Sequence, residues 1–186
     1  TLTEHADLAG LATGPCNDMV VDAEGRAYVG NFGFDRHQGE DARDAVLALV
    51  DTDSQVSVAA EGLSFPNGAV ITPDGSTLIV GETLANRLTA FDRDPETGRL
   101  SNRRVWADLS GEATPAGPHY PDGICLDAAG AIWVTDPRGD AVLRVHEGGE
   151  VSDWIPTGDG RFSFAAMLGG EDGRTLFVLT NTGSGP

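Results

Sequence analysis

The sequence has little positive charge. Its 12 Lys and Arg residues are outnumbered by 29 Asp and Glu residues, which gives a formal net charge of −17 over 186 residues. Such a negative field repels phosphate backbones and anionic membranes and favours cations. Nucleic acid and membrane surfaces are therefore not expected partners, although the same acidity is also compatible with plain solubility or a salty habitat.

Cysteine is scarce as well. The two cysteines, Cys16 and Cys125, are too few for a disulfide framework, and neither belongs to a C-x-x-C pair of the kind that binds zinc or carries redox chemistry. Each lies at or beside an apolar strand pattern. Both are therefore expected to be buried free thiols.

Long apolar runs and helical periods are also missing. No run approaches the ~20 residues of a membrane-spanning helix, and the first residues lack the basic-then-apolar pattern of a signal peptide. Cytoplasmic location is the expectation, although the natural N-terminus need not be part of this chain. The 25 glycines and 10 prolines argue against long helices.

What the sequence has instead is an internal repeat. Four segments each contain a strand pattern, a glycine turn and a second strand pattern, which is the signature of a β-hairpin. The first three are followed by two more strand patterns each, and four antiparallel strands repeated in this way are typical of a propeller blade. The turn glycines are separated by 50, 55 and 43 residues and are Gly25, Gly75, Gly130 and Gly173.

We therefore predict an all-β fold of the β-propeller class, with residues 1–186 as a single partial domain. An open arc of blades leaves two faces uncovered, so the chain is expected to be part of a larger ring and poorly stable alone. The predicted blades span approximately residues 17–60, 67–107, 122–154 and, incompletely, 164–186, with residues 1–8 as the outer strand of a preceding blade.

The residue that leads each hairpin carries the functional signal. These residues are Asn17, Asn67, Asp122 and Phe164. Because inner strands of a propeller run beside its central channel, the first three side chains are expected to converge there. One carboxylate and two amide oxygens suit calcium, magnesium or manganese better than copper or a structural zinc. Taken singly, Asn or Asp before glycine is a common turn residue, but the shared register across three repeats favours a site.

At this point the residues indicate a family. The segments "CNDMVVDAEGRAYVGNFG", "FPNGAVITPDGSTLIVGET", "TGRLSNRRVWADL" and "PDGICLDAAGAIWVTDPRG" closely resemble the SMP-30/gluconolactonase (regucalcin-like) family, in the family's own order and spacing. The resemblance implies a six-bladed propeller with one divalent metal in its channel and lactonase or related ester-hydrolysing activity. Calcium is the expected ion, with magnesium, manganese or zinc as alternatives.

The resemblance also assigns roles to residues. It places the family's metal-binding asparagine at Asn67, its metal-binding and catalytic aspartate at Asp122, and its substrate-contacting asparagine, which also lies near the metal, at Asn17. The remaining ligand of the family, a glutamate of the first blade, would lie ahead of this chain. Members that hydrolyse sugar lactones often carry an arginine at the position of Pro15, so a sugar substrate is less strongly implied than the metal site.

The predicted function is hydrolysis of a lactone, as a small-molecule substrate, by a metal-polarised carbonyl group and water attack, with Asp122 as the base. Two alternatives stay open. The chain could belong to a propeller that binds metal or sugar without turnover, or to a scaffold for protein partners. The oligomeric state is not predicted.

Several other polar residues near the motifs have competing interpretations. His119 could shuttle protons at the channel mouth, but a solvated loop histidine is the favoured interpretation. Asp18 and Asp35 are interpreted as turn residues, and Glu82 could reach the channel rim. Three tryptophans fall on strand patterns and are expected to pack between blades: Trp106, Trp133 and Trp154.

Overall fold

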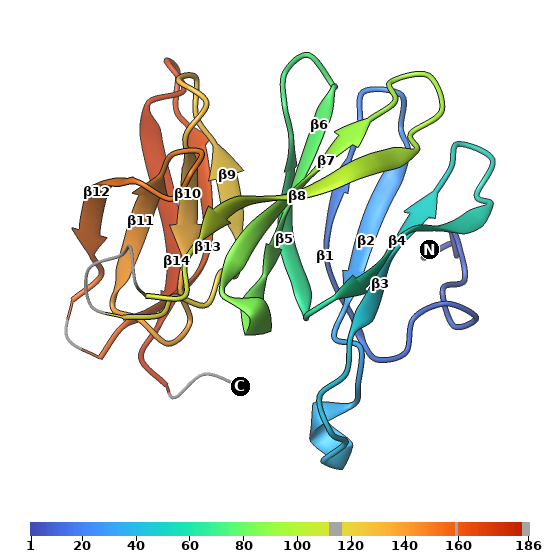
Figure 1. Cartoon of the computed structure of the whole chain (residues 1–186), viewed down its shortest axis with the longest axis horizontal. Helices are drawn as coiled ribbons and strands as arrows, with labels where there is room; N and C mark the ends of the chain where they lie inside the picture. Colours follow the sequence, from blue (N-terminus) through green and yellow to red (C-terminus); the bar gives the residue numbers. More distant parts are fainter. Residues whose placement is uncertain (112–116, 159, 184–186) are drawn as a thin grey trace.

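Each of the first three repeats forms a four-stranded antiparallel sheet, and the last forms a hairpin (Figure 1). The computed structural model describes residues 1–111, 117–158 and 160–183. The first sheet contains β1 (Cys16–Val21), β2 (Ala27–Asn31), β3 (Ala45–Val50) and β4 (Val56–Leu63). The second contains β5 (Pro66–Ile71), β6 (Thr77–Glu82), β7 (Arg87–Arg93) and β8 (Leu100–Asp108).

The third sheet and the hairpin complete this all-β fold, which confirms the predicted class. The third sheet contains β9 (Ile124–Leu126), β10 (Ile132–Thr135), β11 (Ala141–Val145) and β12 (Val151–Pro156), and the hairpin contains β13 (Phe162–Gly169) and β14 (Thr175–Asn181). Two single-turn 3-10 helices, η1 (Arg36–Gln38) and η2 (Thr83–Ala85), follow β2 and β6. Neither helix of the described ranges has the length and apolar character needed to cross a bilayer.

The hairpin turns have the chemistry that the repeat predicts. The Asp22 side chain accepts hydrogen bonds from the backbone N–H groups of Glu24 and Arg26, at 3.0 and 2.8 Å. Gly25 then closes the turn at φ +92°, a conformation that glycine adopts without a Cβ clash. The turn glycines of the other three repeats also have positive φ.

The core lies between sheets rather than within one layer. One cluster joins the first and second sheets and includes Tyr28, Leu47, Leu63, Leu78, Val80 and Phe91. Another joins the second and third sheets and includes Ile79, Leu88, Trp106, Ile132, Leu143 and Val145. Neighbouring sheets therefore hold each other in place through side chains that neither sheet could bury alone.

The first strands of successive sheets lie side by side. β1 contacts β5, β5 contacts β9, and β9 contacts β13. In Figure 1 the first sheet lies at the right and the second in the middle, and the third sheet and the last hairpin overlap at the left. Backbone hydrogen bonds join these strands: Gly68 N–H donates to the carbonyl of Asp122 at 3.0 Å, and Gly123 N–H donates to that of Phe164 at 2.9 Å.

The outer faces of the two end sheets carry exposed apolar side chains, although Ala6 and Leu8 pack on part of the first one. Met19 and Val21 on β1 are 59% and 50% exposed. On the last hairpin, Met167, Phe177 and Leu179 are 62%, 54% and 62% exposed. These are the two open faces that an arc of blades would leave.

Residues 1–8 form no strand. The outer strand expected there needs a neighbouring strand to hydrogen-bond with, and the described chain provides none at that position. Membership of these residues in a preceding blade therefore stays a prediction, as do the blade boundaries.

One prediction about burial is partly wrong. Cys125 is buried, but Cys16, the first residue of β1, is exposed. Trp106 and Trp154 pack in the core cluster between the second and third sheets, as predicted. Trp133 is half-buried and pairs with Cys125 on the other face of the third sheet, and its packing between sheets stays a prediction.

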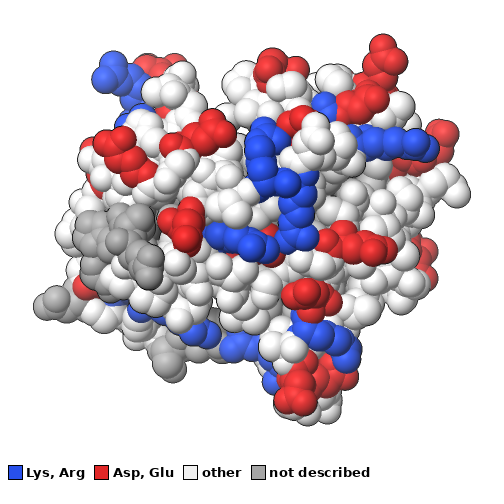
Figure 2. All heavy atoms as spheres, in the orientation of Figure 1, with Lys and Arg blue, Asp and Glu red and all other residues white. Residues whose placement is uncertain are grey.

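A buried ionic cluster fastens the first sheet to the second. Arg93 from β7 contacts the carboxylate of Asp22 from the first hairpin turn, and Arg26 Nε donates to the same carboxylate at 2.7 Å. The Tyr28 hydroxyl accepts a hydrogen bond from Arg93 Nε at 3.0 Å. On the face of the molecule seen in Figure 2, basic side chains lie next to acidic ones.

Candidate functional site

One cavity collects the residues that lead the first three inner strands. It has a volume of about 610 Å³, and Asn17, Asn67 and Asp122 all line it. They come from β1, from β5 and from the segment just before β9, so each belongs to a different repeat. The structure brings together the three side chains that the repeat register predicts, while their chemical roles stay predictions.

Asn67 is held in a fixed orientation by its neighbours. Its side chain is buried, and its Nδ2 donates a hydrogen bond to Thr83 Oγ1 at 3.2 Å. Thr83 Oγ1 in turn donates to the carbonyl oxygen of Pro121 at 2.7 Å. The amide nitrogen is thus occupied by protein partners, which leaves the Asn67 carbonyl oxygen as the atom suited to a cation.

The backbone of Asp122 is fixed from two directions. Its N–H donates to Thr135 on β10 at 3.0 Å, and its carbonyl accepts from Gly68 on β5 at 3.0 Å. A Cβ placed on Gly68 would lie 2.5 Å from that carbonyl oxygen. Glycine at this position therefore allows the second and third repeats to approach closely where the cavity begins.

The electrostatic surroundings of Asp122 favour a cation. Burial, followed by the negative charges of Asp18 and Asp136, raises its pKa to about 7, while the nearby Asn67 amide acts in the opposite direction. The carboxylate therefore has an excess of negative charge around it and lacks a basic partner among the causes of its shift. A bound cation would relieve that excess.

Asn17 and Asp18 form the first-repeat edge of the site. Asn17 is half-buried, and its Nδ2 makes a long hydrogen bond of 3.4 Å to the Pro66 carbonyl. Asp18, interpreted as a turn residue from sequence, instead lies on β1, where partial desolvation raises its pKa. The sequence contains a hint of this difference. The positions that correspond to Asp18 in the next two repeats are the glycines Gly68 and Gly123, so the carboxylate is specific to the first repeat.

The favoured interpretation of His119 as a solvated loop residue is wrong. The side chain is buried, its Nδ1 lies 3.0 Å from Asp136 Oδ2, and its ring contacts the edge of Trp154 at a centroid distance of 5.4 Å. Its partners come from β12 and from the segment after β10, which no local pattern could reveal. His119 thus contacts Asp136, whose negative charge acts on Asp122.

Glu82 does not reach the channel rim. Its carboxylate is fully buried and pairs with Arg87 and Arg103 at 3.0 Å each, and it also accepts from the backbone of Ser64 at 2.8 Å. This cluster faces the outer strands of the second sheet. Asp35 does act as a turn residue, because it caps η1.

The donor set fits a hard divalent cation. Amide and carboxylate oxygens from Asn17, Asn67 and Asp122 are the ligand types that calcium and magnesium prefer. Across residues 1–111, 117–158 and 160–183, no group of three or more His, Cys, Asp or Glu side chains could hold a metal. A cation at this cavity would therefore depend on the two asparagine amides as well as on Asp122.

Most of the remaining wall of the cavity is apolar or basic. Phe32 stacks on Phe65 with ring centroids 4.4 Å apart, and Phe34 tilts against Phe65 at 6.0 Å. Phe65 has a φ of +59°, which is a strained conformation for an aromatic residue, and it lies two residues before Asn67. Arg36 and Arg138 also line the cavity, from the first and third repeats.

Comparison with known proteins places these features in a family. A family model described as the SMP-30/Gluconolactonase/LRE-like region matches residues 1–182. The chain is 30% identical over 175 residues to a pentonolactonase of Haloferax volcanii, covering 91% of this chain and 54% of that protein. It is 31% identical over 169 residues to a 6-deoxy-6-sulfogluconolactonase of Pseudomonas putida, covering 89% and 53%.

Among solved structures, the chain is similar to a calcium-binding protein, regucalcin, of Agrobacterium tumefaciens. The TM-score is 0.79 with 26% identity, over 96% of this chain and 57% of that one. The chain thus spans about half the length of the relatives it matches. The resemblance seen in the sequence and the predicted propeller class are confirmed, and the chain belongs to the SMP-30/gluconolactonase/LRE-like family.

Proposed function

We propose that this chain carries the catalytic part of a metal-dependent lactone hydrolase. The observation that carries the proposal is the convergence of Asn17, Asn67 and Asp122, from three repeats, on one cavity. Membership of a family whose named relatives include lactonases supports the reaction type. A sugar lactone or a related ester is the proposed substrate, and calcium is the proposed ion, with magnesium, manganese or zinc as alternatives.

In this proposal Asn67 and Asp122 hold the cation, and Asn17 contacts the substrate with a weaker contribution to the cation. The bound cation supplies Lewis acidity that polarises the lactone carbonyl. Asp122 accepts a proton from the water whose oxygen bonds to the carbonyl carbon. Cleavage of the ring C–O bond then lets Asp122 return the proton to the ring oxygen, which yields the hydroxy acid.

The residues around Asp122 support its proposed roles as base and cation ligand. The Asn67 amide favours the ionised form of the carboxyl group, and the backbone hydrogen bonds of Asp122 fix the chain that carries it. The stacked rings of Phe32 and Phe65 exclude bulk water from one wall of the cavity. Asp18 keeps the site anionic and thereby strengthens its attraction for a cation.

The first prediction is that Asp122→Asn in the full-length protein abolishes lactone hydrolysis. The variant loses the base and weakens the cation site, so a fall of at least about 100-fold in kcat/KM is expected. A pH-stat assay over a panel of lactones, with and without chelator, measures it. Asp53→Asn, which removes an exposed carboxylate from the distant β3–β4 turn, is the matched control.

Chelator-sensitive turnover that disappears only in Asp122→Asn would support the proposal. Full activity of that variant would contradict the assigned role. Calcium binding by the unmodified protein without turnover of any lactone would instead support a metal- or sugar-binding propeller without catalysis.

A further inference from the structure

Arg138 lines the same cavity as Asp122 but is not one of the predicted metal- or substrate-binding residues. It lies in the turn between β10 and β11, where its backbone N–H donates to Asp136 Oδ1 at 2.8 Å. Its guanidinium carbon lies 4.1 Å from the centre of the Tyr120 ring, a cation–π contact. The exposed side chain is thus held in place by a turn and by an aromatic face.

The charge of Arg138 is not neutralised within the described residues. Its guanidinium forms no ion pair there, although the chain has a net charge of −17. Three arginines of the strands behave differently, since Arg87 and Arg103 pair with Glu82 and Arg144 pairs with Asp127. An arginine that lacks a carboxylate in so acidic a chain, and that faces a cavity, is available for an external anion.

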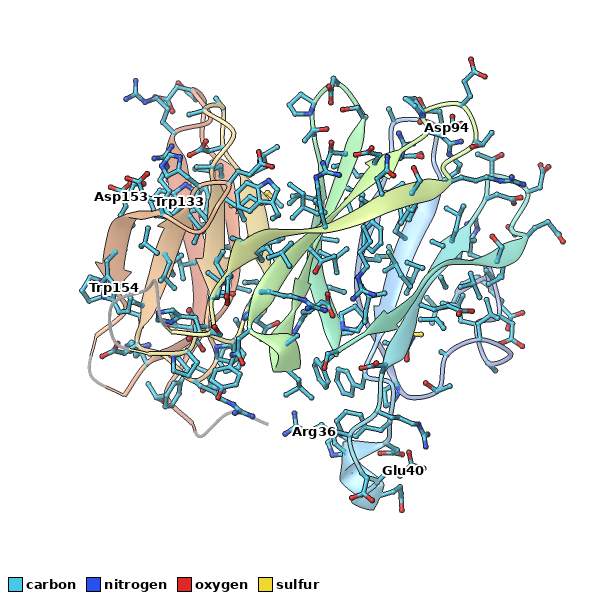
Figure 3. The ribbon with its side chains drawn as sticks, in the orientation of Figure 1. Arg36, Glu40, Asp94, Trp133, Asp153 and Trp154 are labelled. Carbon is cyan, nitrogen blue, oxygen red and sulfur yellow. The ribbon has the colours of Figure 1, made fainter. Side chains whose placement is uncertain are left out.

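A second arginine reaches the cavity from the opposite repeat. Arg36 lies on the loop that projects between β2 and β3, and Figure 3 shows its side chain on the side of that loop facing the rest of the molecule. The cavity wall therefore contains the carboxylate of Asp122, with the negative charge of Asp18 close enough to act on it, and the two arginines Arg36 and Arg138. Such a charge separation would orient a substrate that carries an anionic group away from its reacting carbonyl.

We propose that Arg138 is a specificity-determining residue that binds an oxyanion substituent on the lactone. The class of substrate would be a lactone with a carboxylate, phosphate or sulfonate group remote from the ring ester bond. The planar guanidinium offers two parallel N–H donors to such a group while one of its faces stays on Tyr120. This inference rests on the proposed lactone hydrolysis and narrows its substrate.

The test compares matched lactones in the full-length protein with divalent metal present. The probes are a neutral aldonolactone and the same lactone carrying a terminal carboxylate or a terminal phosphate. Arg138→Gln should lower kcat/KM for the anionic lactones by about tenfold, mainly through KM, and leave the neutral lactone within about twofold. Arg138→Lys, which keeps the charge but loses the paired donors, should be intermediate.

Arg99→Gln provides the control, because it removes one positive charge at an exposed position outside the cavity. The discrimination by Arg138 should also weaken as salt is raised, whereas a purely structural role would not depend on the charge of the probe. The larger effect among the two anionic probes identifies the preferred oxyanion.

Equal effects of Arg138→Gln on neutral and anionic lactones, or no effect on either, would overturn the inference while leaving lactone hydrolysis intact. Absence of turnover with every probe would instead contradict the proposed function. In that case, calorimetric titration with the anionic lactone still tests the role of Arg138. Equal affinity of the unmodified protein and of Arg138→Gln for this lactone would overturn that role.

Discussion

At the scale of single residues, Gly68 shows how a missing side chain shapes the cavity. The glycine donates its N–H to Asp122 across the boundary between two sheets, and any Cβ would collide with the accepting carbonyl. The restriction is steric and not conformational, because φ at Gly68 is not in the left-handed region. The position of Asp122 relative to Asn67 therefore depends on this one close approach.

We predict that Gly68→Ala destabilises the protein by about 1–3 kcal/mol, since the backbones must separate to admit the methyl group. The same separation moves Asp122 away from Asn67, so calcium affinity should also fall. Urea denaturation and calorimetric titration with calcium measure the two effects. Gly10→Ala is the control, because a Cβ there meets nothing within 4 Å; equal stability of the two variants would refute the steric account.

Individual residues also mark the limit of what the sequence predicts. The register of the repeats is sufficient to place Asn17, Asn67 and Asp122 at one cavity. It does not reveal that the charge of Asp18 acts on Asp122, or that His119 is buried against Asp136 and Trp154. Contacts between distant segments determine such burial, and local patterns contain no information about them.

At the scale of elements, the hairpin turn of the first sheet is tied to the second sheet by charge. Asp22 receives hydrogen bonds from Arg26 and is contacted by Arg93 from β7. Burial acts to raise the pKa of Asp22, but the hydrogen bonds of these arginines hold it below its ordinary value of 3.8. The folded state thus prefers the ionised carboxylate more strongly than the unfolded chain does.

We predict that Asp22→Asn lowers the free energy of unfolding by about 3 kcal/mol at neutral pH, because two buried arginines lose their buried carboxylate and keep only the half-exposed Glu24. For a depressed pKa, the stabilisation is complete above the unfolded-state value and is lost as pH falls through the folded-state value. The difference between the variant and the unmodified protein should therefore shrink below pH 3.8. Urea denaturation as a function of pH measures it, with Asp53→Asn as the control; a difference that is constant with pH would contradict the ionic account.

The strands and hairpin turns are the features of this structure that the sequence predicts best. The hairpins follow from alternating strand patterns around glycines that need positive φ, and these are local properties. Strand β9 is shorter than its counterparts and residues 1–8 form no strand at all. Neither feature is visible in the local strand patterns.

At the scale of the whole molecule, the main feature is the set of exposed apolar side chains on the outer faces of the two end sheets. The side chains of Phe177 and Leu179 are 54% and 62% exposed, and Met19 is exposed at the other end of the arc. In a ring of sheets each such face would be covered by a neighbour, as both faces of the second sheet are here. We expect the same of the full-length protein.

We predict that Phe177→Ser has little effect, within about 0.5 kcal/mol, on the stability of residues 1–186 produced alone. In the full-length protein the same change should cost about 2–4 kcal/mol, since the ring would then be buried. Thermal and urea denaturation of both forms measure the difference, and the isolated piece should melt at a lower temperature and bind more of a hydrophobic dye. Similar costs in both forms would show that this face stays uncovered.

The distribution of Asn17, Asn67 and Asp122 over three sheets also has a mechanical consequence. An ion bound by all three would cross-link the three sheets, so separating the sheets would require releasing the ion. The affinity for the ion and the free energy that holds the sheets together would then be coupled. Raising the concentration of free calcium should therefore slow the separation of all three sheets and not the unfolding of a single sheet.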